Sequence, residues 1–280
     1  MIAALAVALA LLAPAAPPQR VVSLNLAADE VLVEILPPER LVGVTTLADE
    51  RGTSSVVGRV PAGVTRFPRV DLERLVALQP DLVVVSEYTD ADARRLLESS
   101  GIRTHRMTGL STPDGYRQAI LDLGRAVSAE AAAARLVARY DKVRAELQKR
   151  LAGAPRPRVL YWAQGMTAGR DTAIGALVET AGGTNAAADA GLSGIAPIGA
   201  ERAFTIDPDV VLIGTWPGTR EALQSDPLLA QMRAVREGRV VEMPTELVVA
   251  LSHHAADAFW HLASRLHPRR VREGRPPALP

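Results

Sequence analysis

A helix–turn–strand pattern occurs twice in this chain at a fixed spacing. Glu73 precedes Pro80 by seven residues, and Glu201 precedes Pro208 by the same interval, so the two copies are offset by 128 residues. Each copy predicts a short helix, a Pro-Asp turn and a buried apolar strand. A pattern that recurs at this distance indicates a chain folded as two similar lobes.

Strands alternate with helices through both halves of the sequence. Helical spacing over residues 27–36 follows an apolar run, whereas residues 51–69 are rich in Gly, Pro, Ser and Thr and predict a long loop. This alternation is typical of an α/β fold with parallel sheets and helices on both faces. The apolar runs that predict buried strands are 20–24, 41–44, 81–85, 102–107, 159–162, 209–214 and 239–243.

One long helix is expected between the two halves. Residues 128–151 contain no glycine or proline and are rich in Ala, Arg, Glu and Leu. At 1.5 Å per residue this helix would be about 36 Å long. We therefore expect an N-terminal lobe over 16–127, a connecting helix over 128–152, a C-terminal lobe over 153–268 and a flexible tail over 269–280.

The charge balance and the absence of cysteine exclude several classes of protein. The 32 basic and 31 acidic residues give a formal net charge of +1, which argues against a nucleic-acid binder. Without cysteine the chain can form no disulfide, thiolate zinc site or iron–sulfur cluster, and it has no cysteine to carry a lipid. We expect no nucleic-acid partner, no lipid anchor and no resident metal or cofactor.

The N-terminus has the character of an export signal. Residues 2–13 form an uninterrupted apolar run that is too short to span a bilayer. Ala13-Pro14-Ala15 fits a small-residue cleavage site, although no Lys or Arg precedes the run. A buried N-terminal helix is the alternative interpretation. We expect a signal peptide over residues 1–15 and a periplasmic protein that begins near Ala16.

Taken in order, these segments resemble the substrate-binding proteins of ABC importers for ferric siderophores, haem and cobalamin. The resemblance extends from Arg20 to about His267, and its carriers are 20–24, 41–44, 70–83 and the long central helix. It implies two Rossmann-like lobes with parallel sheets, joined by a single rigid helix. It also implies a monomer that captures a metal chelate between the lobes and delivers it to a dimeric permease.

The resemblance gives the repeated glutamates a role. The family carries one exposed glutamate on each lobe that docks onto arginines of the permease, and the match places these at Glu73 and Glu201. One carboxylate per lobe can orient the protein on a basic dimeric partner. The alternative is that each glutamate only stabilises the first turn of its helix.

Ligand contacts are expected where the strands end, because two-lobed α/β proteins bind ligands at the carboxyl ends of their strands. Tyr88, Trp162 and Trp216 follow three predicted strands, and their rings could stack on a macrocycle or a catechol. For both tryptophans the alternative is ordinary core packing. Segments 23–25 and 86–88 are further strand ends that are expected to face the cleft.

A loop and a helix start supply the remaining candidates. Arg66, Phe67 and Arg69 lie before the first repeated helix, where related proteins place ligand contacts, and a guanidinium there would suit an anionic chelator. A solvated loop charge is the alternative for each arginine. His253 and His254 begin the last helix, where they could meet a chelated metal or hydrogen-bond the chelator. The alternative interpretation is that both are ordinary, partly exposed histidines at a helix end.

Two other functions compete with chelate transport. A receptor for bare zinc or manganese needs histidines and carboxylates from both lobes, but the N-terminal half contains only His105. A periplasmic enzyme or chelate-modifying protein is the second alternative. Against it, residues 191–195 lack the final glycine of a G-x-S-x-G motif, and no nucleotide-binding glycine motif occurs. We expect a binding protein without catalytic activity, with ferric chelates as the first ligand class, then cobalamin and haem.

Overall fold

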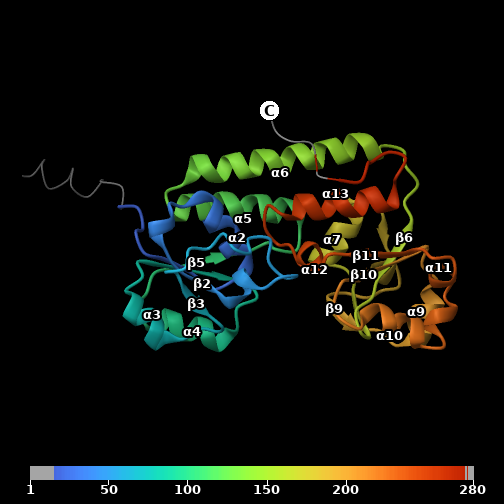
Figure 1. The fold of residues 1–280 in the computed structure, drawn as a ribbon, viewed down its shortest axis with the longest axis horizontal. Coiled ribbons are helices and arrows are strands. Elements are labelled where there is room, and N and C mark those ends of the chain that lie inside the picture. The colour runs from blue at the N-terminus through green and yellow to red at the C-terminus, as the bar shows by residue number, and fades with distance from the viewer. Residues whose placement is uncertain (1–15, 275, 277–280) are drawn as a thin grey trace, which may run out of the picture.

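Two α/β lobes lie side by side beneath one long helix in the computed structural model (Figure 1). The structure describes residues 16–274 and 276, so the signal peptide expected over 1–15 lies outside the described residues. The expectation of two lobes with parallel sheets, joined by a long helix, is confirmed. Among the described residues, no helix has both the length and the apolar character that a bilayer crossing requires.

The N-terminal lobe is built on a five-stranded sheet in the order β3-β2-β1-β4-β5, and every neighbouring pair is parallel. Its strands are β1 (Val21–Ser23), β2 (Leu41–Thr45), β3 (Thr65–Phe67), β4 (Leu82–Ser86) and β5 (Thr104–Met107). Its helices are α2 (Leu26–Ile35), α3 (Leu72–Leu78), α4 (Ala91–Ser99) and α5 (Pro113–Ala126), with short 3-10 turns at Pro38–Arg40 and Thr46–Asp49. The segment predicted as a long loop therefore contains the edge strand β3.

The C-terminal lobe repeats this plan with a four-stranded parallel sheet in the order β11-β10-β6-β8 and an antiparallel pair, β7 and β9. Its strands are β6 (Arg158–Tyr161), β7 (Met166–Ala168), β8 (Thr184–Asn185), β9 (Ile195–Pro197), β10 (Val210–Gly214) and β11 (Val240–Met243). Its helices are α7 (Ala173–Thr180), α8 (Ala186–Asp189), α9 (Ala200–Ile206), α10 (Thr219–Ser225), α11 (Arg233–Arg236), α12 (Thr245–Val248) and α13 (Ala255–Leu266), with a 3-10 turn at Leu229–Gln231.

The sequence repeat corresponds to the same hydrogen-bonded unit in each lobe. Asp81 accepts from the backbone N–H of Arg20 at 2.9 Å, and Asp209 accepts from that of Arg158 at 2.9 Å. The two arginine side chains donate to the carbonyl of the last residue of α3, at 2.8 Å, and of α9, at 3.0 Å. Each unit thereby ties the end of its helix to the start of a central strand, and it satisfies carbonyls that a helix end leaves unpaired.

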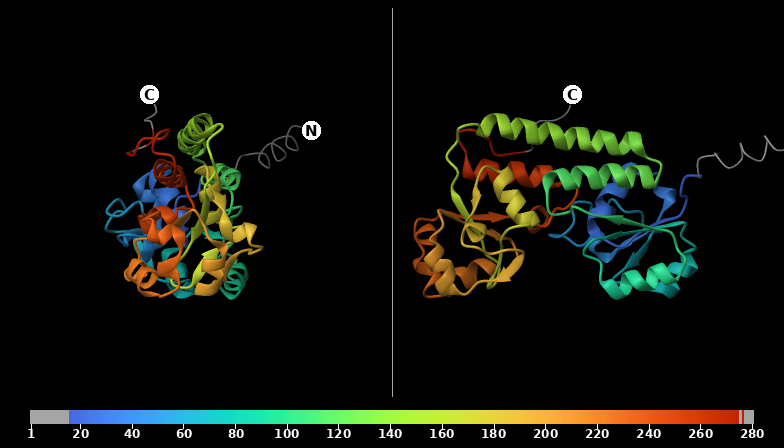
Figure 2. Two further views of the ribbon diagram at one scale, coloured as in Figure 1. Left: turned by 90° about the vertical axis from the view of Figure 1, so that its right-hand side faces the viewer. Right: turned by 180° about the vertical axis from the view of Figure 1, so that it is seen from behind.

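Helix α6 (Glu130–Leu151) connects the lobes and covers both of them, as the views from the end and from behind also show (Figure 2). It begins two residues after the expected start, because Ser128 has a φ of 53° and belongs to the turn after α5. Gly124 of α5 approaches it so closely that a Cβ there would lie 2.4 Å from Cβ of Ala133. The two helices therefore pack at short distance.

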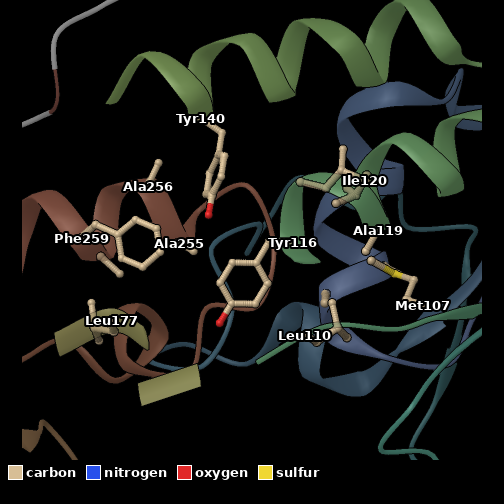
Figure 3. Packing of buried hydrophobic residues seen from close by; sticks show 14 of the residues in the cluster. Met107, Leu110, Tyr116, Ala119, Ile120, Tyr140, Leu177, Ala255, Ala256 and Phe259 are labelled. Carbon is tan, nitrogen blue, oxygen red and sulfur yellow. The ribbon is translucent and has the colours of Figure 1, made fainter. Parts of the chain in front are cut away.

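Tyr140, near the middle of α6, joins the two lobes through their buried core (Figure 3). Its side chain is fully buried, and its ring centroid lies 6.0 Å from that of Phe259 on α13. Its hydroxyl donates to the carbonyl of Pro113 on α5 at 2.9 Å. One hydrophobic cluster runs from the N-terminal sheet through α5, α6 and α13 to the C-terminal sheet. This continuity resists independent movement of the lobes.

The described part of the expected tail packs against this helical layer. Val271 is completely buried, and Trp260 on α13 donates from Nε1 to the carbonyl of Arg272 at 3.2 Å. The guanidinium of Arg150 at the end of α6 lies 5.1 Å from the centroid of the Trp260 ring. Ordered packing thus continues beyond residue 268.

The buried carboxyl of Asp29 makes the stability of the N-terminal lobe dependent on pH. Asp29 on α2 accepts from Oγ1 of Thr45 at 2.5 Å and from its backbone N–H at 3.2 Å. Burial raises the pKa of Asp29 from 3.8 to about 7, so the folded protein retains a proton that the unfolded chain releases. The retained proton contributes to the free energy of unfolding. This contribution is fully present below pH 4 and declines as the pH rises from about 4 to about 7.

Replacing this carboxyl by an amide should remove that decline. Between pH 4.5 and pH 8, we expect the free energy of unfolding of Asp29→Asn to rise by on the order of 2–4 kcal/mol relative to that of the wild type, because the amide has no proton to release. Urea unfolding at the two pH values measures the difference. Asp92→Asn, at an exposed carboxyl on α4, is the control and should show little change. An unchanged gap between wild type and Asp29→Asn would contradict the assignment.

Candidate functional site

A cavity of about 420 Å³ lies at the carboxyl ends of the N-terminal strands. The segments that follow β1, β2, β3 and β4 converge there because the strands are parallel. Val249 and Leu251, in the segment between α12 and α13, close the side that faces the C-terminal lobe. The N-terminal lining residues are Leu24, Asn25, Leu26, Ala27, Thr45, Thr46, Leu47, Phe67, Pro68, Arg69, Val70, Ser86, Tyr88, Thr89 and Leu110.

The polar groups of this cavity are mainly hydroxyls and hydrogen-bond donors. Asn25 caps α2 by accepting from the N–H of Ala28 at 2.9 Å. Its buried Nδ2 finds no hydrogen-bond partner among the residues that the structure describes. The positive end of the α2 dipole also lies at this wall. The positive end of a helix favours an anionic or strongly polar oxygen on the ligand.

Three of the predicted ligand residues line the cavity, with different exposure. Tyr88 is 60 % exposed, and partial burial together with Glu87 raises the pKa of its hydroxyl, which keeps the phenol protonated. Arg69 is also exposed. The ring of Phe67 is buried in the core, and the guanidinium of Arg74 lies 5.1 Å from its centroid. Tyr88 and Arg69 therefore offer side chains to a ligand, and Phe67 supports the wall.

Arg66 organises the preceding loop and does not line the cavity. Its Nε donates to Oδ2 of Asp49 at 2.8 Å. Its Nη1 donates to the carbonyls of Val64 and Pro61 at 2.6 and 2.8 Å. These bonds occupy the guanidinium and hold the strand β3 next to the segment after β2.

The two candidate tryptophans have different surroundings in the C-terminal lobe. Trp162 is 5 % exposed and belongs to the apolar cluster of that lobe, so it presents little surface to a ligand. Trp216 follows β10 and is partly exposed. Its indole lies against Gly214, where a Cβ would be 2.2 Å from Cζ3. Trp216 thus remains a candidate contact across the cleft.

His253 and His254 lie outside the cavity lining. They directly precede α13 and approach Glu34 of α2, with His253 Nε2 at 4.0 Å from Glu34 Oε1. Burial, with a contribution from His254, lowers the pKa of His253 to about 3, so that this ring is neutral at physiological pH. The structure therefore separates the histidine pair from Tyr88 and Arg69.

Several lining residues were not among the predicted contacts. Thr45 ends β2 and Thr46 follows it, so the rule that ligand contacts lie at strand ends would have found them. Val249 and Leu251 belong to an irregular segment with no such signal. Their position depends on how the segment before α13 crosses from one lobe to the other.

The repeated glutamates occupy equivalent exposed positions. Glu73 is in the first turn of α3 and Glu201 in the first turn of α9. Both helices lie on the side of the molecule opposite α6 (Figure 1). One turn further along, Val76 is 56 % exposed and Phe204 is 40 % exposed, and these two residues are again 128 positions apart. Each lobe thus presents a carboxylate beside an apolar side chain.

Proteins similar to this chain include a cobalamin-binding protein and two heme-binding proteins. A cobalamin-binding protein from Halobacterium salinarum is 30 % identical over 267 residues, covering 89 % of this chain and 70 % of its own length. The apo periplasmic heme-binding protein RhuT from Roseiflexus sp. RS-1 has a TM-score of 0.78 at 24 % identity, with 89 % of this chain and 98 % of that chain covered. BhuT in complex with two hemes has a TM-score of 0.76 at 26 % identity, with 88 % and 97 % covered.

The sequence profile of the periplasmic binding protein family matches residues 21–247, which include both sheets and the connecting helix. The architecture, the position of the cavity and the profile agree. The resemblance that the sequence indicated is thereby confirmed, and the chain belongs to the periplasmic binding protein family.

Proposed function

We propose that this protein captures a metal chelate in the inter-lobe cleft and delivers it to the permease of an ABC importer. The observation that carries the proposal is the cavity at the strand ends, with exposed Arg69 and exposed Tyr88, in a member of this family. The family consists of substrate-binding proteins, and the proposed role includes no catalytic step. Export through the signal peptide over 1–15 and action as a monomer are parts of the same proposal.

We favour a corrinoid as the chelate, which changes the order of ligand classes that the sequence suggested. The 30 % identical relative is a cobalamin-binding protein. The exposed hydroxyl of Thr46 suits the peripheral amides of a corrinoid, and Arg69 is the one charged side chain that lines the cavity within the described chain. The volume is near the lower end of ligand sites, which hold roughly 300–1,000 Å³. A macrocycle would therefore extend from it toward Trp216.

Haem is the second candidate because of Tyr88. A phenolate can serve as an axial ligand of haem iron, and this side chain stands exposed at the cavity. Two of the structural neighbours are described as heme-binding proteins. The raised pKa of Tyr88 opposes formation of the phenolate in the free protein. The two candidates therefore place different demands on the same hydroxyl.

Substitutions at Tyr88 separate the two ligands. We expect cyanocobalamin at 100 times its dissociation constant to stabilise the protein by about 2.7 kcal/mol. Tyr88→Ala should weaken corrinoid binding about 3- to 10-fold, because an aromatic contact contributes roughly 0.5–1.5 kcal/mol, and Tyr88→Phe should bind like the wild type. Calorimetric titration with cyanocobalamin, haem and a ferric siderophore measures both effects.

The outcome for Tyr88→Phe decides between corrinoid and haem. If haem binds and this variant loses it, while cyanocobalamin causes no stabilisation, the corrinoid assignment is wrong and the phenol is an iron ligand. Arg95→Ala, at an exposed arginine on α4 away from the cavity, is the control and should leave every affinity unchanged. Stabilisation by a ferric siderophore alone would support ferric chelates as the first ligand class, as the sequence suggested.

The permease would dock on the exposed faces of α3 and α9. Glu73 and Glu201 supply one carboxylate per lobe, and Val76 and Phe204 supply an apolar side chain one turn away. A dimeric permease with basic, partly apolar sites related by a twofold axis is the partner that this arrangement fits. The equivalence of the two lobes supports docking over a purely local role at each helix start.

Removing both carboxylates should impair delivery and leave capture intact. We expect Glu73→Ala with Glu201→Ala to bind the chelate like the wild type, because both residues lie outside the cavity lining. Exposed ion pairs contribute on the order of 1 kcal/mol each, and desolvated interface pairs roughly 2–5 kcal/mol, so transporter association should weaken by at least 10-fold, most clearly at low salt. Binding to the reconstituted permease and uptake measure this.

The matched control removes an exposed glutamate from each lobe at another place. Glu98→Ala on α4 and Glu221→Ala on α10 change the net charge by the same amount. The control should associate with the permease as the wild type does. Uptake at the wild-type rate by the Glu73 and Glu201 double variant would refute the docking assignment, whereas equal losses in both double variants would reduce it to an effect of net charge.

A further inference from the structure

Three potential metal ligands converge outside the cavity, at the junction of the two lobes. Glu34 lies near the end of α2 in the N-terminal lobe, and His253 and His254 precede α13 in the C-terminal lobe. One ligand atom from each of the three lies within 4.8 Å of the other two. None of the three residues lines the 420 Å³ cavity. The cluster is therefore separate from the proposed chelate site.

The two imidazoles have nitrogens that the protein does not use. Within the described chain, His253 Nδ1 and His254 Nε2 are buried and have no hydrogen-bond partner. Buried polar atoms are usually paired, so the unpartnered Nε2 of His254 calls for an explanation. His253 turns its other ring nitrogen, Nε2, toward Glu34. The rings lie 4.1 Å apart, centroid to centroid, at an angle of 38°. Both rings therefore lie side by side near the carboxylate of Glu34.

Asp257 on α13 supplies the outer contact that a metal-bound histidine requires. Its Oδ2 lies 3.4 Å from His254 Nδ1. A carboxylate on one ring nitrogen fixes the tautomer and leaves the other nitrogen free to bind a metal. Asp257 is itself held by Arg139 of α6, at 3.4 Å. The connecting helix thus takes part in orienting His254.

One cation competes with a metal for the carboxylate. The guanidinium of Arg59 forms an ion pair with Glu34, and its side chain is 45 % exposed. Glu34 is 25 % exposed, so both side chains have room to rearrange. Arg59 can turn toward water when a divalent ion takes its place beside the carboxylate. The ion pair preserves the position of Glu34 when no metal is bound.

We propose that Glu34, His253 and His254 form a zinc site that links the two lobes. Two imidazoles and one carboxylate, with water as the fourth ligand, are a donor set that Zn²⁺ accepts in tetrahedral geometry, and they disfavour Mg²⁺ and Ca²⁺. With bonds of about 2.0–2.1 Å, neighbouring ligands stand about 3.4 Å apart around the ion. His253 Nε2 and Glu34 Oε1, at 4.0 Å, need only a small side-chain rotation to reach that spacing.

The bound zinc would hold the two lobes together and would not contact the chelate. Its ligands come from two lobes that are otherwise joined by packing and by α6, so the bound ion cross-links α2 to the segment before α13. That segment also carries Val249 and Leu251, which close the cavity. Zinc would therefore fix the wall of the cleft that the C-terminal lobe contributes. This proposal does not depend on the identity of the chelate.

Titration with zinc in the absence of any chelate tests the site. The probe is ZnCl₂ added to the full chain, purified without a histidine tag and treated with EDTA. We expect one Zn²⁺ per chain in calorimetry, and Co²⁺ in its place should give the visible absorption of a tetrahedral site. His254→Gln and Glu34→Gln should each weaken zinc binding at least 10-fold and remove the rise in melting temperature that zinc causes in the wild type.

Two further variants sharpen the test. His261→Gln, on α13 but outside the cluster, is the control and should bind zinc like the wild type. Arg59→Gln should strengthen binding several-fold, because it removes the cation that competes for Glu34. Both ligand variants replace side chains that retain some exposure, 25 % for Glu34 and 14 % for His254, so they should fold even if a change at buried His253 does not.

Three results would overturn the proposal. The first is the absence of stoichiometric zinc binding by the wild type in the micromolar range. The second is zinc binding that His254→Gln and Glu34→Gln leave unchanged, since the ion would then be held elsewhere. A loss of zinc binding in His261→Gln as large as in His254→Gln would likewise place the ion further along α13, beside His261.

Discussion

Tyr140 buries its ring between the lobes, and the relative position of the two sheets depends on that contact. The ring packs on Phe259 of α13, and the hydroxyl bonds to the start of α5. Helix α6 alone would leave the lobes free to swing about its ends. Because α5 and α13 pack beneath it, the connection is a layer of three helices that shares one apolar core with both sheets. The cavity can therefore have one wall from each lobe.

The parts of the fold that the sequence predicted are those with a local signal. The repeat around Pro80 and Pro208 corresponds to two equivalent helix–strand units, and the stretch without glycine or proline forms α6. Helix α5 was not predicted. It contains Gly115 and Gly124, which weaken a helical pattern, and Gly124 serves the close approach of α5 to α6. That reason becomes visible only when the partner helix is in place.

The candidate site shows the same division. The strand-end rule located Tyr88, because each carboxyl end of a parallel strand lies at the same edge of the sheet. It could not distinguish Trp162, which turns into the core, from Trp216, which keeps some exposure. The guanidinium of Arg66 could bind an anion, but it donates its hydrogen bonds to loop carbonyls. Which way a side chain turns depends on neighbours that are distant in sequence.

The position of the three-helix layer has a mechanical consequence. Helices α5, α6 and α13 lie along one side of the molecule, and α3 and α9 lie on the opposite side (Figure 1). A small rotation of one lobe about this layer moves the layer itself least and the tips of α3 and α9 most. Those two helices are the ends of a long lever arm. Any partner that holds both helices acts at the greatest distance from this layer, so a modest force at the surface can change the separation of the lobes.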